Sequence, residues 1–367
     1  MFTHRSLFTI VTLLAASHLP AADLGVYGQT NLVSDIPGLA ANTDPNLINP
    51  WGVSESGASP FWISDNGGGV STLYNSAGTP QSLVVKIPNP GGGDSAPTGQ
   101  VFNSSAGFNG DIFVFATEDG TIAGWRNALG TNAEILFNNS SNGAIYKGLA
   151  SATVGSSSYL FATDFHNNRI DVFRSTGSPS LPGDFTDATI PAGYAPFNVQ
   201  NIGNQLYVTY AKQDPNAHDD MPGAGNGFVD VFGLNGNLIR RVASNGPLNS
   251  PWGLAVAPSS WGSIAGDLLV GDFGSGDIDI FSQSGDFLGM LNNENGNPIA
   301  NEGLWTLTFG NNGNGGSANS LYITAGLNGE SDGLFARIDP VPEPSTFVLL
   351  GLAICLAFVR KHRSAKP

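Results

Sequence analysis

The sequence predicts an all-β fold, a six-bladed β-propeller, from its composition, a repeated strand pattern and a repeat length of about 50 residues. Only 12% of the 367 residues are charged, whereas 49 are Gly and 23 are Pro. Helical bundles need charged exposed faces, so this composition favours short strands joined by tight turns. The 29 acidic residues outnumber the 14 basic ones, and such an acidic surface repels phosphate and excludes nucleic acid as a partner.

Two independent markers define the repeat between residues 49 and 340. The first is a strand of apolar residues that ends in a small and then a polar residue, as in Phe61-Trp62-Ile63-Ser64-Asp65, and it recurs six times. The second is a following strand that ends in an aromatic residue, and these residues are Tyr74, Trp125, Phe173, Phe232, Phe281 and Phe335. Because both markers keep one period, each unit supplies about four short strands, as a propeller blade does.

Turn residues support this division into blades. A glycine follows each of the first five aromatic residues, as a hairpin turn with positive φ requires, at Gly78, Gly130, Gly177, Gly236 and Gly285. The long fourth interval predicts an inserted loop around residues 214–227. The sixth unit lacks a last strand, so we expect a strand near residues 25–33 to complete it and close the ring. Seven blades or a pair of β-sandwiches are the alternatives.

The N-terminal residues 1–22 are typical of a secretory signal peptide. Arg5 precedes an apolar run over residues 7–16, and the small residues Ala21 and Ala22 follow. We therefore expect the exported domain to cover residues 23–340. The single cysteine, Cys355, lies outside this domain, so packing rather than a disulfide must stabilise it.

The C-terminal residues form a tripartite tail. Residues 341–345 contain Pro342, Glu343 and Pro344, residues 346–359 are apolar, and residues 360–367 are basic. The apolar part predicts a single short membrane segment whose basic flank stays in the cytoplasm. An ordinary membrane anchor with a Pro-rich spacer is the alternative interpretation.

This tail resembles the PEP-CTERM sorting signal. The resemblance implies a Gram-negative bacterium that makes exopolysaccharide, and a membrane-embedded exosortase that cuts near Pro342, Glu343 and Pro344. The segment 346–359 would then hold the chain in the inner membrane only before processing. We expect the propeller to reach the periplasm, the cell surface or the extracellular matrix.

The repeats resemble NHL-type blades. The propeller as a whole also resembles an uncharacterised family that often carries the PEP-CTERM tail. The residues that carry the likeness lie in four segments: Asn49-Pro50-Trp51-Gly52-Val53, Gly227-Phe228-Val229-Asp230-Val231-Phe232, Pro251-Trp252-Gly253-Leu254-Ala255-Val256-Ala257-Pro258 and Gly303-Leu304-Trp305. This resemblance implies a fold and a sorting route and no established reaction.

Histidines are scarce in the propeller, which limits catalytic hypotheses. Only His166 and His218 lie there, and no nucleophile elbow, zinc-type His pair, P-loop or EF-hand loop is present. His166 lies in a turn rich in Asn, so we interpret it as an exposed turn residue rather than a catalytic one. His218 lies in the acidic loop 214–220, which is either a metal cluster or, as we favour, a solvated loop.

Three carboxylates are the candidate metal ligands. Asp65, Asp164 and Asp272 occupy the same repeat position in blades one, three and five, so they could face a divalent cation such as calcium in the channel. The alternative is that each caps its own turn. Three tryptophans, Trp51, Trp252 and Trp305, begin blades, and we interpret them as packing between blades rather than a sugar platform.

The function predicted from these features is that of an exported, exosortase-sorted binding or scaffold module. Its expected partners are exopolysaccharide or proteins of the envelope, because the tail accompanies a rigid fold with few catalytic residues. The alternative is a metal-dependent propeller hydrolase or lyase with its site at the channel mouth. Propellers host both binding and catalysis, so the fold alone does not decide between them.

Overall fold

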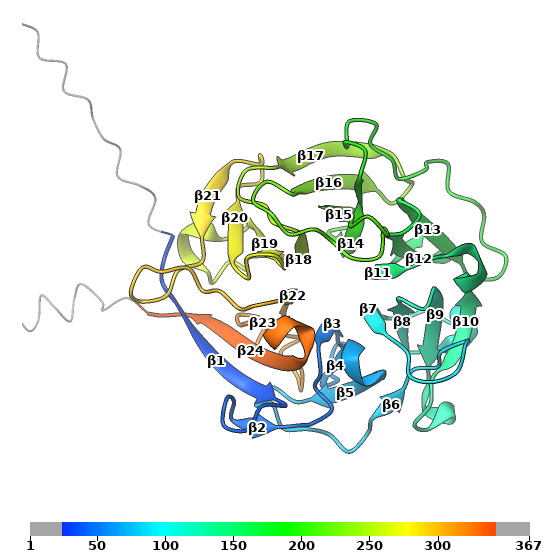
Figure 1. Cartoon of the computed structure of the whole chain (residues 1–367), viewed down its shortest axis with the longest axis horizontal. Coiled ribbons are helices and arrows are strands. Elements are labelled where there is room, and N and C mark those ends of the chain that lie inside the picture. Colours follow the sequence, from blue (N-terminus) through cyan, green and yellow to red (C-terminus); the bar gives the residue numbers. More distant parts are fainter. Residues whose placement is uncertain (1–23, 343–367) are drawn as a thin grey trace, which may run out of the picture.

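A computed structural model describes residues 24–342, and its strands form six sheets arranged in a ring (Figure 1). Each sheet is one blade of antiparallel strands, except that the short edge strand of the sixth sheet pairs in parallel, and one strand of each sheet lies nearest the central axis. The six inner strands, β3, β7, β11, β14, β18 and β22, each contact the inner strands of the two neighbouring blades. The predicted six-bladed β-propeller is confirmed, and the seven-bladed and sandwich alternatives are excluded.

Blade one contains β3 (Pro50–Ser54), β4 (Phe61–Asp65), β5 (Val70–Tyr74) and β6 (Val85–Lys86). Blade two contains β7 (Pro97–Phe102), β8 (Phe113–Thr117), β9 (Thr121–Trp125) and β10 (Glu134–Asn138). Blade three contains β11 (Tyr146–Val154), β12 (Ser157–Asp164) and β13 (Arg169–Arg174).

Blade four contains β14 (Tyr194–Ile202), β15 (Gln205–Lys212), β16 (Gly227–Gly233) and β17 (Leu238–Ser244). Blade five contains β18 (Pro251–Val256), β19 (Leu268–Asp272), β20 (Ile278–Phe281) and β21 (Phe287–Met290). Blade six contains β22 (Leu304–Phe309), β23 (Leu321–Gly326), β24 (Asp332–Pro340) and β1 (Tyr27–Ser34), with β2 (Asn42–Thr43) beside β1.

The helices of the described chain are single turns. One is α1 (Leu327–Glu330), and the 3-10 turns cover Asn66–Gly68, Phe108–Gly110, Asn127–Leu129, Ser140–Asn142 and Gly262–Ile264. None of the described helices has the length and apolarity needed to cross a membrane. The predicted signal peptide 1–22, the membrane segment 346–359 and the basic end 360–367 lie outside the described residues.

The two ends of the described chain meet in blade six. Strand β1 pairs antiparallel with β24, with Tyr27 opposite Pro340 and Ser34 opposite Leu334. The ring therefore closes with a strand from the N-terminal side, as the sequence predicts, although β1 runs one residue past the predicted range. This pairing covers the edge that β24 would otherwise expose.

Blade three departs from the expected four strands. Its described sheet ends at β13, and residues 175–193 continue as loop and turns. Three prolines, Pro179, Pro182 and Pro191, interrupt this segment. Proline has no amide hydrogen to donate to a sheet, so a fourth strand cannot form its ladder here.

The predicted turn glycines have the backbone conformation that their turns require. Gly78, Gly130, Gly177, Gly236 and Gly285 all have positive φ, between 63° and 97°.

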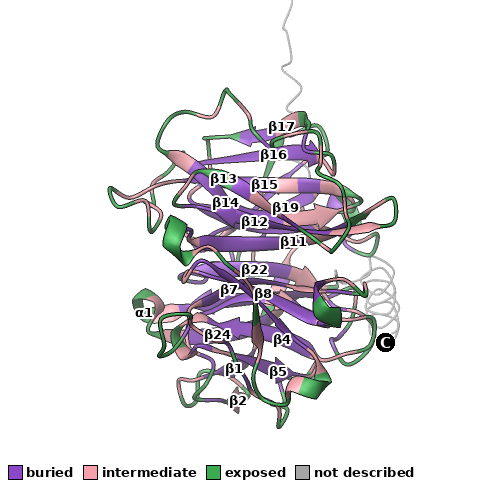
Figure 2. Ribbon diagram, turned by 90° about the vertical axis from the view of Figure 1, so that its right-hand side faces the viewer, coloured by how far each residue is buried: buried purple, intermediate pink, exposed green. Residues whose placement is uncertain are grey.

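Buried residues fill the sheets of every blade, and exposed residues gather in the loops and along the outer strands (Figure 2). Blades therefore pack face against face, and the loops at the two ends of the ring are free to vary.

Each inner strand carries a bulge at the same place, where its pairing with the second strand shifts register. Glycines near the bulges allow neighbouring inner strands to approach closely. A Cβ on Gly99 would lie 2.4 Å from the backbone nitrogen of Leu149, and one on Gly52 would lie 2.6 Å from the carbonyl oxygen of Thr98. The bulges therefore bring six backbones together around a narrow axis.

Candidate functional site at the centre of the propeller

One residue opens the bulge of each inner strand, and together these six residues surround the axis. They are Trp51, Thr98, Lys147, Phe197, Trp252 and Trp305. All six are buried. Four of them are aromatic, whereas blade two contributes a hydroxyl and blade three an ammonium group.

The aromatic members meet across the axis. Trp305 stacks on Trp51 with 3.5 Å between ring centroids, on Phe273 at 4.1 Å, and meets Trp252 edge-on at 5.8 Å. Phe165 and Phe197 join the same cluster. We call these six rings, Trp51, Phe165, Phe197, Trp252, Phe273 and Trp305, the aromatic plug. It fills the centre of the propeller, so the packing interpretation of the three tryptophans is confirmed.

Lys147 lies directly on the aromatic plug. Its side chain is 2% exposed, and Nζ lies 5.1 Å from the ring centroid of Trp51 and 6.0 Å from that of Phe165. The ammonium donates to the Glu118 carboxylate, and to Asp219 Oδ1 at 3.1 Å. A buried charge requires partners of this kind, and the ring faces add a cation–π attraction.

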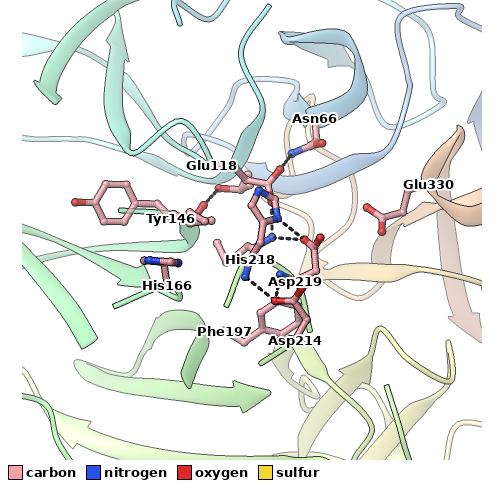
Figure 3. A network of polar contacts seen from close by, with 12 residues as sticks. Asn66, Glu118, Tyr146, His166, Phe197, Asp214, His218, Asp219 and Glu330 are labelled. Carbon is pink, nitrogen blue, oxygen red and sulfur yellow. Dashed lines mark hydrogen bonds and ion pairs between the residues drawn. The ribbon is translucent and has the colours of Figure 1, made fainter. Parts of the chain in front are cut away.

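The polar residues around Lys147 form what we call the charged mouth: Asn66, Glu118, Lys147, His218, Asp219 and Glu330. They come from turns and strands of blades one, two, three, four and six. Figure 3 shows Asn66, Glu118, His218, Asp219 and Glu330 around one region between the blades. Asn66 Nδ2 donates to Glu118 Oε2 at 2.9 Å, and His218 Nδ1 lies 2.9 Å from Asp219 Oδ1. Asn49 Nδ2, which is buried, donates to Glu330 Oε2 at 2.7 Å.

The pKa values of the carboxylates in and beside the mouth shift in opposite directions. Burial, opposed by the bond from Asn49 and reinforced by the Glu118 carboxylate, leaves the pKa of Glu330 above its usual range. Burial also raises the pKa of Asp220, which follows Asp219, to about 6. The side chain of Asp219 is 64% exposed, and the Lys147 ammonium outweighs its partial desolvation and holds its pKa below its usual range. Burial by itself lowers the pKa of Lys147, yet Glu118 and Asp219 raise it above its ordinary value.

A second feature lies on the other side of the aromatic plug. There the inner strands line a cavity of about 360 Å³, whose polar side chains include Ser54, Glu55, Gln100, Ser151 and Asn201. We call it the rear pocket. Burial raises the pKa of Glu55 to about 7. The Ser54 hydroxyl and Gln100 Oε1 are buried without a hydrogen-bond partner among the described residues.

Known proteins of viral origin are similar to this chain over most of its length. The uncharacterised protein R648 of Acanthamoeba polyphaga mimivirus is 34% identical over 84% of this chain and 78% of its own length. The uncharacterised protein L690 of the same virus is 34% identical over 74% of this chain and 76% of its own length. The chain belongs to the R648 and L690 family.

Solved structures place this R648 and L690 family member among propellers. Virginiamycin B lyase from Staphylococcus aureus has a TM-score of 0.50 at 11% identity, over 86% of this chain and 99% of the lyase. A Bacteroides thetaiotaomicron protein of unknown function has a TM-score of 0.52 at 12% identity, over 85% of this chain and 76% of that protein. At these identities the likeness shows the fold alone.

The tail of this family member matches a known sorting signal. Residues 340–361 match the family model of the PEP-CTERM protein-sorting motif. The motif implies exosortase-dependent sorting and export to the cell envelope or surface. Of the expected processing residues, Pro342 is described, and Glu343 and Pro344 lie beyond the described part of the chain.

The structure places the two candidate histidines near the mouth. His166 is exposed, and its Nδ1 lies 3.2 Å from the carbonyl oxygen of Ala217. His218 is exposed as well, but it reaches Asp219 and lies close enough to Glu118 for the three to share an ion. The acidic loop thus contributes two members of the charged mouth.

The three predicted metal ligands lie in separate blades, and no described hydrogen bond or ion pair joins any two of them. Asp65 Oδ2 accepts from Thr72 at 2.7 Å, Asp164 accepts from the Asn167 amide at 3.3 Å, and Asp272 Oδ1 accepts from the amide of Asn249 at 3.0 Å. All three are buried. Their joint binding of a cation in the channel stays a prediction.

Sequence reasoning missed Glu118, Lys147, Glu330 and the rear pocket with Glu55. A usable signal was present for Lys147. In Lys147-Gly148-Leu149 the lysine aligns with the tryptophans of Trp51-Gly52-Val53 and Trp252-Gly253-Leu254. A charged residue at a repeat position that is aromatic elsewhere indicates a specific partner at the axis.

Proposed function

We propose that this protein is an exported, exosortase-sorted binding module whose charged mouth receives a polar ligand, namely exopolysaccharide. The observation that carries the proposal is the convergence of five blades on one cluster of hydrogen-bonding side chains. A rigid ring holds each of these side chains in place, as a binding site requires.

The position of the tail supports this proposal. The second strand of blade one, β4, ends on the side of the mouth. Its last residue, Asp65, pairs with Pro50 at the start of β3 and directly precedes Asn66 of the mouth. Strand β24 runs the opposite way, so Pro340 pairs with Tyr27 on the face away from the mouth, and Val341 N donates to the carbonyl of Val26 at 2.8 Å. A chain held through its tail would therefore present the mouth outward.

The charges of the mouth define the ligand class. The carboxylates of Glu118 and Asp219 both contact the buried Lys147 ammonium, and Glu330 is a third carboxylate of the mouth. Carboxylates and amide oxygens accept hydrogen bonds from sugar hydroxyls and from ammonium groups, whereas the carboxylates repel other carboxylates. The ligand is therefore a neutral or amino-sugar polysaccharide rather than a polyuronate.

Calorimetry of the purified protein with a neutral glucan, a glucosamine oligomer and a polyuronate tests this proposal. We expect binding of the first two and no binding of the third. The variants Glu118→Gln and Asp219→Asn lower the affinity at least about tenfold, since each removes a charged hydrogen-bond acceptor. The matched variant Glu55→Gln, at the rear pocket, leaves the affinity unchanged. Equal binding by all variants, or a preference for polyuronate, contradicts the proposal.

A second candidate function, hydrolysis or elimination at the mouth, is favoured by one observation. The pKa of Glu330 is raised and that of Asp219 is lowered, and such a pair supplies an acid and a base. Shortening of the same oligosaccharides, measured by mass spectrometry, tests this candidate. Activity that Glu330→Gln abolishes without loss of binding supports an enzyme, and intact oligosaccharides after long incubation rule it out for these substrates.

A further inference from the structure

We propose that blade five holds a calcium ion between Asp272, Asp277 and Asp279. Each of these residues offers a carboxylate oxygen, and the three oxygens lie within 4.8 Å of one another. Ligand oxygens around calcium lie about 2.3–2.6 Å from the ion, so two of them can be up to roughly 5 Å apart. The spacing therefore fits calcium bound by carboxylates, with water completing the shell.

The strongest observation is that two of these side chains are buried without a partner. Asp272 and Asp279 are both 0% exposed. Three of their carboxylate oxygens, Asp272 Oδ2 and both oxygens of Asp279, have no hydrogen-bond partner among the described residues. No described ion pair reaches any of the three aspartates. Buried carboxylates without a donor are costly, and a bound cation would remove that cost.

Blade three provides an internal comparison at equivalent positions. Pairing of Leu160 with Phe173 and of Leu268 with Phe281 aligns the two blades. Asp164 and Asp171 then correspond to Asp272 and Asp279, and Arg169 corresponds to Asp277. In blade three the guanidinium of Arg169 bridges both carboxylates, at 3.2 Å from Asp164 Oδ2 and 2.7 Å from Asp171 Oδ1.

Blades one and four also satisfy the equivalent groups from within the chain. In blade four the buried Asp230, equivalent to Asp279, pairs with Arg241. In blade one Thr72 takes the place of Asp279 and donates to Asp65. Blade five alone places a third carboxylate where blade three has a cation. The repeat therefore points to a positive charge that blade five obtains from outside the chain.

The remaining contacts hold the site in place. The backbone amide of Asn249 donates to Asp272 Oδ1 at 3.0 Å, and Ser275 Oγ donates to Asp277 Oδ1 at 2.7 Å. The amide of Asp272 donates to the carbonyl of Asp277 at 3.0 Å. These bonds leave one oxygen of Asp272, one of Asp277 and both of Asp279 for an ion.

The test is calcium binding to the chelator-treated full chain, followed by calorimetry and by thermal unfolding. We expect one calcium per chain at this site and a rise in Tm of about 2–5 °C at saturating calcium. Asp279→Asn lowers the affinity at least about tenfold. Asp277→Arg, which copies blade three, abolishes the response to calcium and melts no lower than the calcium-free parent.

The matched control is Asp286→Asn. Asp286 is an exposed aspartate of the same blade that accepts from Ser284 at 2.7 Å, as Asp277 accepts from Ser275. Asp286→Asn should leave calcium binding unchanged. Asp277→Asn should weaken calcium binding, and it replaces Asp277→Arg as the test if the arginine variant fails to fold. Glu118→Gln must also leave calcium binding unchanged. A parent protein that binds no calcium, or whose calcium is lost only in Glu118→Gln, overturns the proposal. The two buried carboxyls would then share a proton.

Discussion

At the scale of single residues, Lys147 organises the charged mouth. It is the one member of the central ring with a positive charge, and it compensates Glu118 and Asp219 from below. Its ammonium also lies over the rings of Trp51 and Phe165, and so places a charged group on the mouth side of the aromatic plug. An ammonium in this position also reduces the need for a metal ion at the group formed by Glu118, His218 and Asp219.

The variant Lys147→Met should destabilise the protein by about 1–3 kcal/mol, because it leaves the largely buried Glu118 carboxylate without its charged partner. Chemical denaturation measures the change. The control is Lys86→Met, since the Lys86 side chain is 58% exposed and lies 3.8 Å from Asp94. An exposed pair of this kind contributes about 1 kcal/mol or less. Equal effects of the two substitutions would show that the buried ammonium of Lys147 contributes no more to stability than the exposed one of Lys86.

Glu55 should make stability depend on pH. Its pKa rises from 4.5 to about 7 on folding because of burial. A group with a raised folded-state pKa stabilises the fold fully below its unfolded pKa and loses that contribution as pH rises through the folded pKa. Glu55→Gln should therefore match the parent at pH 4 and exceed its unfolding free energy by about 1–3 kcal/mol at pH 8.

Urea denaturation at both pH values tests this expectation. The exposed Glu294 provides the control, because Glu294→Gln removes the same charge from a solvated position. A parent protein whose difference from Glu55→Gln is the same at pH 4 and pH 8 would show that the rear pocket leaves Glu55 solvated.

At the scale of elements, the bulged inner strands set how closely the blades meet. Gly99 is decisive, because a Cβ there would lie 2.4 Å from the backbone nitrogen of Leu149 in the next blade. We expect Gly99→Ala to cost about 1–3 kcal/mol through this overlap. Gly57→Ala is the control, since nothing lies within 4 Å of the place that its methyl group would take. If both alanines are tolerated equally in thermal unfolding, close contact of inner strands is not required.

Strands and turns were predictable from the sequence because their causes are local. The aromatic residue at the end of each third strand and the turn glycine after it lie within one hairpin, so a period is visible in the chain itself. The short third blade was missed because the repeat markers, Phe173 and Gly177, persist where prolines prevent the last strand.

The charged mouth was not predictable because its causes are distant. Asn66, Glu118, Lys147, Asp219 and Glu330 are spread over most of the chain, and each lies in a turn or strand start that has an ordinary local sequence. Only closure of the ring brings them together. The acidic loop with His218 was found, since its composition is unusual over seven residues, but its partners Glu118 and Lys147 were not.

At the scale of the whole molecule, the ring has two different ends. The mouth carries charges, whereas the rear pocket is lined mainly by neutral polar groups with Glu55 among them, and the aromatic plug separates the two. The described chain ends on the rear side. Sorting and binding can therefore use opposite faces of one rigid body.

Hydrogen–deuterium exchange of the protein with and without a bound neutral glucan tests whether the charged mouth is the ligand site. We expect protection in the mouth turns 66–69, 118–120, 214–220 and 327–331, and unchanged exchange around Glu55 and Gln100. Protection confined to the rear pocket, or no protection in any of the mouth turns at saturating glucan, would show that the charged mouth is not the ligand site.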